Sequence, residues 1–164
     1  MGKSYTKGID TLKLPEFLFP VINAFMKLLL NSPMHALVSK EIMLLEFEGR
    51  KSGRLIQTPV SYIISGNEVR CFTTKDGGWW YSFRHSQTKP LRVMVRIAGH
   101  SIKGTAIALH SSEPEIAAEL STFLGKIPGN AAYHSISLDS SKQPVSSDVE
   151  AAIGDCVLIS IKLG

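Results

Sequence analysis

Cysteine is scarce in this chain of 164 residues. Only Cys71 and Cys156 are present, and they lie far apart, each within a strand-like pattern. So few cysteines exclude a small domain held together by disulfides, and the chain is long enough to bury a hydrophobic core without them. We expect both thiols to be buried in a protein of a reducing, cytoplasmic compartment. One disulfide between them stays open as the alternative.

The motifs of several common enzyme classes are missing. The sequence contains no Gly-x-Ser-x-Gly, no Cys-x-x-Cys, no Walker A motif and no Gly-x-Gly-x-x-Gly after a strand. These absences argue against an α/β-hydrolase, a dithiol redox protein, a P-loop NTPase and a Rossmann dehydrogenase. The five histidines lack the spacing of metal ligands, so the sequence predicts no metal site.

No apolar run reaches the length of about 20 residues that crosses a bilayer. Residues 14–30 come nearest, but they are interrupted by Glu16, Pro20, Asn23 and Lys27. A signal peptide is disfavoured because Asp10 lies in the leader and no small-x-small cleavage site follows. We expect residues 1–40 to form a helical segment packed on the following domain. The alternative is a helix that touches a membrane surface or a second subunit.

The charge is only mildly one-sided. Eighteen Lys and Arg residues against 14 Asp and Glu give a net charge of +4, and 44% of the residues are hydrophobic. This is ordinary globular composition, sufficient for one domain. The small basic excess favours an anionic small molecule or lipid as partner and does not indicate nucleic acid.

The middle of the chain alternates apolar and polar residues with the period of a β-strand. Strands are predicted at 42–48, 56–64, 68–74, 91–97, 100–109 and 156–163. A short helix is predicted at 79–84 and an amphipathic one at 112–125, and residues 126–148 have the composition of a loop. Hairpin connections in series then indicate a mainly β, α+β domain over residues 41–164, built as a six-stranded antiparallel barrel.

The turn at 49–54, Gly-Arg-Lys-Ser-Gly-Arg, is the first candidate site. Two glycines let the backbone curl so that successive N–H groups point into one concavity, which is an anion-binding nest. Arg50, Lys51 and Arg54 add positive charge, and Ser52 adds a hydroxyl. A plain solvated hairpin turn has the same composition, so both interpretations stay open.

The aromatic run Trp79-Trp80-Tyr81 is the second candidate. It follows a strand that ends in small and polar residues, where a flat ring system can lie with hydroxyl and N–H groups at its edge. The alternative is that both tryptophans simply close the mouth of the barrel.

An ordered set of motifs carries a family resemblance. The turn at 49–54 precedes Thr-Pro-Val at 58–60, Lys-Asp-Gly-Gly at 75–78, the Trp80-Tyr81 pair and the strand at 91–97. In this order they resemble the motifs of the deazaflavin-dependent nitroreductase family, over roughly residues 42–125. The resemblance implies a split β-barrel of the FMN-binding type. It also implies an oxidoreductase that transfers a hydride from a reduced deazaflavin to a quinone, nitroaromatic or enone acceptor.

The resemblance further implies a cofactor site, with 8-hydroxy-5-deazaflavin (coenzyme F-420) as the cofactor and FMN as the alternative. Its implied residues are Arg50, Lys51, Ser52, Gly53 and Arg54 for the anionic tail, Thr58, Pro59 and Val60 beneath the ring, and Thr73, Thr74, Lys75, Trp80 and Tyr81 around the ring. Tyr133 is a candidate on the substrate side. The implied partner is a small-molecule redox acceptor, and a homodimer is a further expectation. A non-catalytic carrier of a cofactor, haem or lipid stays open as another function, because a fold alone does not imply catalysis.

Overall fold

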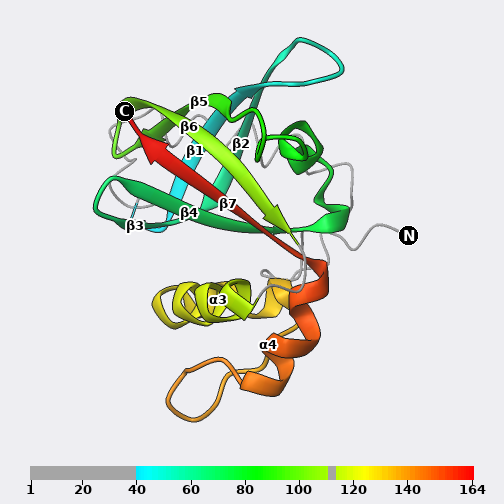
Figure 1. Ribbon diagram of the computed structural model, residues 1–164. Helices are drawn as coiled ribbons and strands as arrows, with labels where there is room; N and C mark the ends of the chain where they lie inside the picture. Colours follow the sequence, from blue (N-terminus) through cyan, green and yellow to red (C-terminus); the bar gives the residue numbers. More distant parts are fainter. Residues whose placement is uncertain (1–39, 111–113) are drawn as a thin grey trace, which may run out of the picture.

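The computed structural model of the protein describes residues 40–110 and 114–164 (Figure 1). The strands are β1 (Ile42–Glu48), β2 (Leu55–Ser61), β3 (Ile63–Ser65), β4 (Glu68–Thr74), β5 (Leu91–Ile97), β6 (His100–His110) and β7 (Cys156–Leu163). The α-helices are α3 (Pro114–Lys126) and α4 (Ser146–Ala152). Short 3-10 helices are η3 (Lys75–Gly77), η4 (Trp79–Phe83), η5 (Pro128–Asn130), η6 (Ala132–His134) and η7 (Ile153–Asp155).

The strands form one antiparallel sheet in the order β2-β1-β5-β6-β7-β4-β3. The sheet curls into a half-barrel (Figure 1), which fits the predicted mainly β, split-barrel class. Among the described residues it has seven strands, whereas six were predicted. The additional strand arises because the predicted strand at 56–64 is divided at Tyr62 into β2 and β3.

The division at Tyr62 is where the chain crosses from one edge of the sheet to the other. β2 pairs with β1 at one edge and β3 pairs with β4 at the opposite edge. Between them, Tyr62 turns its side chain into the core, with 7% exposed, and its N–H donates to the carbonyl of Glu41 at 2.9 Å. One segment, residues 55–65, therefore serves both edges, and this brings the two edges of the curled sheet near each other.

The expectation of hairpins in series was wrong at one point. β4 is not beside β5, because the last strand, β7, lies between β6 and β4 and pairs with both. Residues 75–90 instead leave the sheet as η3 and η4 before β5 begins.

Two hydrophobic cores share the central strands. Inward residues such as Val69, Cys71 and Ile159 fill the barrel. On the outer face, Phe72 and Leu158 join a second core with α3, which contributes Ile116, Leu120, Phe123 and Leu124. Figure 1 shows α3 and α4 together on the side of β4 and β7. These strands are thus buried on both faces, and both cysteines are buried free thiols.

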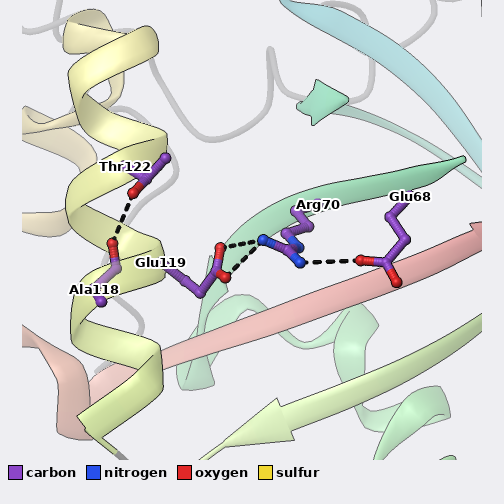
Figure 2. Close-up of polar contacts among 5 residues, drawn as sticks. All are labelled: Glu68, Arg70, Ala118, Glu119 and Thr122. Atoms are coloured by element: carbon purple, nitrogen blue, oxygen red, sulfur yellow. Dashed lines mark hydrogen bonds and ion pairs between the residues drawn. The ribbon is translucent and has the colours of Figure 1, made fainter. Parts of the chain in front are cut away.

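One polar contact also fixes α3 to the sheet. Figure 2 shows Arg70 of β4 held between Glu119 of α3 and Glu68 of its own strand. Its guanidinium lies 2.6 Å from Glu119 and 3.0 Å from Glu68. Because all three side chains are partly exposed, the contact orients the helix more than it stabilises the fold.

Helix α4 and the 3-10 turns η5 and η6 lie within or at the end of the segment predicted as a loop, so none of the three was predicted from the sequence. In α4 only Val149 is buried, which leaves too short an apolar pattern to recognise. The predicted helical segment at 1–40 lies outside the described residues, apart from Lys40. Within the described part of the chain, no helix is long and apolar enough to cross a membrane.

Candidate functional site

Two neighbouring cavities lie where the split of the barrel meets η4. The first, here called the strand cavity, measures about 480 Å³. It is lined by Ile56, Gln57, Thr58, Pro59, Val60, Ser61, Phe72, Thr73, Gly77, Trp79, Asn130 and Tyr133. The second, the turn cavity, measures about 560 Å³ and is lined by Gly49, Arg50, Lys51, Ser52, Ile56, Gly78, Tyr81, Ser82 and Arg84. They meet at Ile56 and at the pair Gly77 and Gly78, and both volumes are typical of small-molecule sites, at about 300–1,000 Å³.

The turn cavity is positively charged. Arg50 and Lys51 come from the β1–β2 turn, Arg84 follows η4, and no carboxylate is among the lining residues. The turn projects beyond the sheet (Figure 1), and the N–H of Arg50 donates to Ser82 Oγ at 3.4 Å, which ties the turn to η4. Three cations on a wall without a carboxylate favour a negatively charged ligand.

The backbone of this turn is largely occupied by its own hydrogen bonds. The N–H groups of Gly49 and Gly53 donate to carbonyls within the turn, each at 2.8 Å, and that of Arg54 donates to Ser52 Oγ at 3.2 Å. Ser52 accepts that bond, so its hydroxyl proton stays available to a ligand. An anion in this cavity would therefore be held mainly by side chains, and less by the predicted nest of N–H groups.

Strand β2 forms one long wall of the strand cavity. Six consecutive residues, 56–61, line it, and β2 is an edge strand that pairs only with β1. Pro59, which has no N–H, is tolerated there because an edge strand leaves one side without ladder bonds. Asn130 of η5 closes one end by donating from Nδ2 to Ser61 Oγ at 3.1 Å. The cavity is therefore a slot beside a strand edge.

Thr73 lies on the opposite wall, on β4. Its side chain is 2% exposed, and its Oγ1 has no hydrogen-bond partner among the described residues. A buried hydroxyl without a partner costs about 1–3 kcal/mol, and native proteins rarely keep one without a reason. Thr73 lines the strand cavity, so rotation of its side chain would let this hydroxyl reach the polar edge of a ligand there.

The two tryptophans have different environments. Trp79 lines the strand cavity and packs on Phe47, with ring centroids 5.9 Å apart. Trp80 is buried, lines neither cavity, and donates from Nε1 to the carbonyl of Lys75 at 2.7 Å. Tyr81 stacks on Trp80 and lines the turn cavity. Trp79 is thus the tryptophan placed to contact a ring system in the strand cavity, whereas Trp80 is buried and stacks on Tyr81.

Tyr133, on η6, lines the strand cavity from the side of the helices. Its hydroxyl lies 3.3 Å from the hydroxyl of Thr74, which in turn donates to the carboxylate of Asp76 at 2.5 Å. Three polar groups are therefore joined in a line that starts at the cavity.

A third, smaller cavity of about 170 Å³ lies behind Tyr133 and Thr74 and is called the side cavity. His134 and Cys156 line it, with His134 Nδ1 3.5 Å from Cys156 Sγ. Burial lowers the pKa of His134 to about 4 and raises the pKa of Cys156 to about 12, so both side chains are neutral near pH 7. A neutral thiol is a poor nucleophile. In the described residues, no group of three or more His, Cys, Asp or Glu side chains is arranged to hold a metal ion.

The structure thus brings together many, but not all, of the residues named from the sequence. Those on a cavity wall are Arg50, Lys51, Ser52, Thr58, Pro59, Val60, Thr73, Tyr81 and Tyr133. Gly53, Arg54, Lys75 and Trp80 line neither the strand nor the turn cavity, and Thr74 lines the side cavity. Sequence reasoning missed Gln57, Ser61, Ser82, Arg84 and Asn130 as cavity residues, and it named Trp79 in the aromatic candidate but not among the implied cofactor residues. Arg84 could have been recognised from the sequence, because it is a basic residue directly after the aromatic segment 79–83.

Comparison with known proteins shows the fold and no family. The sequence matches no protein-family model and no curated protein. The protein Atu2129 of Agrobacterium tumefaciens, of unknown function, has a similar structure with a TM-score of 0.50 and 13% identity, over 82% of this chain and 58% of that one. An F420 reductase (TM-score 0.42, 15% identity, 83% and 90% coverage) and an FAD-binding protein of Mesorhizobium loti (TM-score 0.45, 14% identity, 80% and 87% coverage) are also similar.

Proposed function

We propose that this protein is an oxidoreductase that binds 8-hydroxy-5-deazaflavin and reduces a quinone, nitroaromatic or enone. The observation that carries the proposal is the pairing of the two cavities. A slot with a buried, unpartnered Thr73 hydroxyl shares the wall residue Ile56 with a pocket that has three cations and no carboxylate among its lining residues. A planar, polar-edged ring with an anionic tail has this shape and charge. The family resemblance of the ordered motifs at 49–81 supports the same class of ligand.

The residues present fit such a cofactor. Arg50, Lys51 and Arg84 would bind the anionic tail. The edge of β2 and Thr73 would face the polar rim of the ring, and Trp79 would cover part of it. When bound, the reduced cofactor supplies a hydride to the acceptor. The protein's part is to orient the two partners and to keep water from the slot.

Ligand titration tests the proposal directly. Purified protein is titrated with the deazaflavin and, in parallel, with FMN, and absorbance and fluorescence are followed. Menadione is then added to the reduced complex. We expect saturable deazaflavin binding and oxidation of the complex by menadione. Tighter binding of FMN than of the deazaflavin would mean that the protein is an FMN-dependent oxidoreductase. Binding without turnover would indicate a carrier. Binding of neither cofactor would refute both enzyme functions.

The turn cavity is tested by a pair of variants. Lys51→Ala with Arg84→Ala removes two cations that line it, and we expect cofactor affinity to fall about tenfold or more, since each exposed charged contact contributes about 1 kcal/mol. Arg54→Ala removes one positive charge from the turn outside the cavity, as Lys51→Ala alone does inside it, and is the matched control for that single variant. Equal losses in both would mean that net charge, and not the cavity, attracts the ligand.

Thr73 gives a second test with opposite effects on stability and binding. Thr73→Val removes a hydroxyl that has no partner among the described residues, so the ligand-free protein should be as stable as the wild type or more so. Cofactor affinity should fall about 3–10-fold through the lost hydrogen bond. Denaturation in urea and ligand titration measure the two effects. A variant that loses stability but keeps affinity would show that the hydroxyl does not face a ligand.

A further inference from the structure

The line of polar groups from Tyr133 to Asp76 connects the strand cavity with the protein surface. Tyr133 lines the cavity, Thr74 is 9% exposed, and Asp76 is exposed. The Thr74 oxygen lies 3.3 Å from Tyr133 Oη and 2.5 Å from Asp76 Oδ1. One hydroxyl can accept a hydrogen bond from one neighbour while it donates its own proton to the other, so Thr74 bridges Tyr133 and Asp76.

Tyr133 is also the one titratable side chain among the described residues that line the strand cavity. The other polar side chains on its wall are hydroxyls and amides, which do not exchange a proton readily near neutral pH. His134, the next residue, lines the side cavity instead and is uncharged there. Reduction of an acceptor in the slot requires one proton besides the hydride, and Tyr133 is the group placed to give it.

A phenol that gives up its proton must regain it, so Tyr133 needs a source of protons on the side away from the acceptor. Tyr133 and Thr74 also line the side cavity, whose other walls carry Ser135, Asp148 and Asp155. This volume of about 170 Å³ has polar side chains on part of its wall and room for several waters at about 30 Å³ each. Thr74 is thus within reach of proton sources on two sides.

We propose that Tyr133, Thr74 and Asp76 form a proton relay from solvent to the acceptor in the strand cavity. The inference rests on the proposed function. The Tyr133 O–H bond breaks as an O–H or C–H bond forms on the acceptor, which has received the hydride. The Thr74 hydroxyl, which donates to the Asp76 carboxylate in this structure, turns and gives its proton to the phenolate oxygen. The Thr74 oxygen then takes a proton from the Asp76 carboxyl, which has received that proton from hydronium in the solvent. Tyr133 is then the catalytic acid, and Thr74 and Asp76 act through it.

The hydrogen-bonded chain is tested first without any cofactor. In ligand-free protein with labelled threonine, the Thr74 hydroxyl proton should give an NMR signal in slow exchange with water, assigned by its loss in Thr74→Val. Asp76→Asn and Tyr133→Phe should each shift this signal, because each changes one partner of the hydroxyl. A signal that neither variant moves, or a proton in rapid exchange in the wild type, would overturn the relay.

Kinetics with the loaded protein test its role. Tyr133→Phe is expected to lower kcat about a hundredfold, as loss of a general acid does, and Thr74→Val at least tenfold. Thr74→Ser keeps the hydroxyl and should restore most of kcat. Cofactor affinity measured by fluorescence should stay within twofold in all three variants. An unchanged kcat in Thr74→Val, or equal losses in Thr74→Val and Thr74→Ser, would overturn the relay. Failure of the wild type to bind a cofactor would refute the proposed function instead, while the NMR signal still decides whether the chain exists.

Discussion

Acidification from pH 7 to pH 5 is expected to destabilise this fold through one histidine. His134 is 5% exposed, its Nε2 has no hydrogen-bond partner among the described residues, and its Nδ1 faces the thiol of Cys156. Aromatic rings surround it, with Phe72 and Tyr133 both in edge-on contact. Asp148 and Asp155 line the same side cavity, but burial dominates: it lowers the pKa of His134 and keeps the imidazole neutral in the folded protein.

The size of the effect follows from the two states. Burial lowers the pKa of His134 to about 4 in the folded protein, whereas an unfolded histidine titrates at about 6.5. The unfolded state therefore binds a proton first as the pH falls, and stability decreases from pH 6.5 down to about pH 4. Between pH 7 and pH 5 the loss amounts to about 2 kcal/mol. Asp148, whose pKa is lowered by the N–H of Ser137, adds a loss of the same sign only below about pH 4.

Urea denaturation at pH 7, 6 and 5 measures this loss as a change in the free energy of unfolding. His134→Phe keeps an aromatic ring but has no titrating group. Between pH 7 and pH 5, its free energy of unfolding should therefore fall by about 2 kcal/mol less than that of the wild type. His85→Gln replaces an exposed histidine and serves as the control, with the slope of the wild type. If His134→Phe loses stability as steeply as the wild type, the imidazole is not the cause, and the reasoning from burial fails.

Two further predictions concern the sheet. Arg70→Met should lower the free energy of unfolding by about 0.5–1 kcal/mol, because Glu119 loses its partner but both side chains are partly exposed to solvent. Adding Glu119→Gln should then cost little more, and two fully additive losses in urea denaturation would show that the pair is not coupled. Gly104→Ala places a Cβ 2.8 Å from the carbonyl oxygen of Lys162 and should cost about 1–3 kcal/mol by strain between β6 and β7. Gly129→Ala, where nothing lies within 4 Å, should be nearly neutral, and equal melting temperatures for the two variants would contradict this account.

Most of the strands could be predicted because their alternation is local. β1, β4 and β5 occupy the predicted residues, since each carries its period of two within seven residues. The division at Tyr62 could not be predicted, because apolar residues continue on both sides of it. Only the curvature of the whole sheet decides that the chain must change edges there.

The residues of the candidate site could likewise be predicted only in part. The basic turn, Thr58 to Val60 and Thr73 were recognised as motifs, and the structure places them on the walls of two adjoining cavities. The choice between Trp79 and Trp80 depends on how η4 leaves Gly78, whose φ is +76°, and two adjacent aromatic residues give no sequence signal for it. Asn130 reaches the slot only because residues 127–134 fold back over the barrel in short turns.

The position of β7 has a consequence for how the chain folds during synthesis. β7 is made after every other described strand, yet it lies between β6 and β4. Without β7, no strand pairing would join β2-β1-β5-β6 to β4-β3, and β6 and β4 would each present an open edge. The pairing of β4 with β7 joins residues more than 80 positions apart, which is slow to form. The nascent protein therefore depends on its last strand to remove two aggregation-prone edges at once.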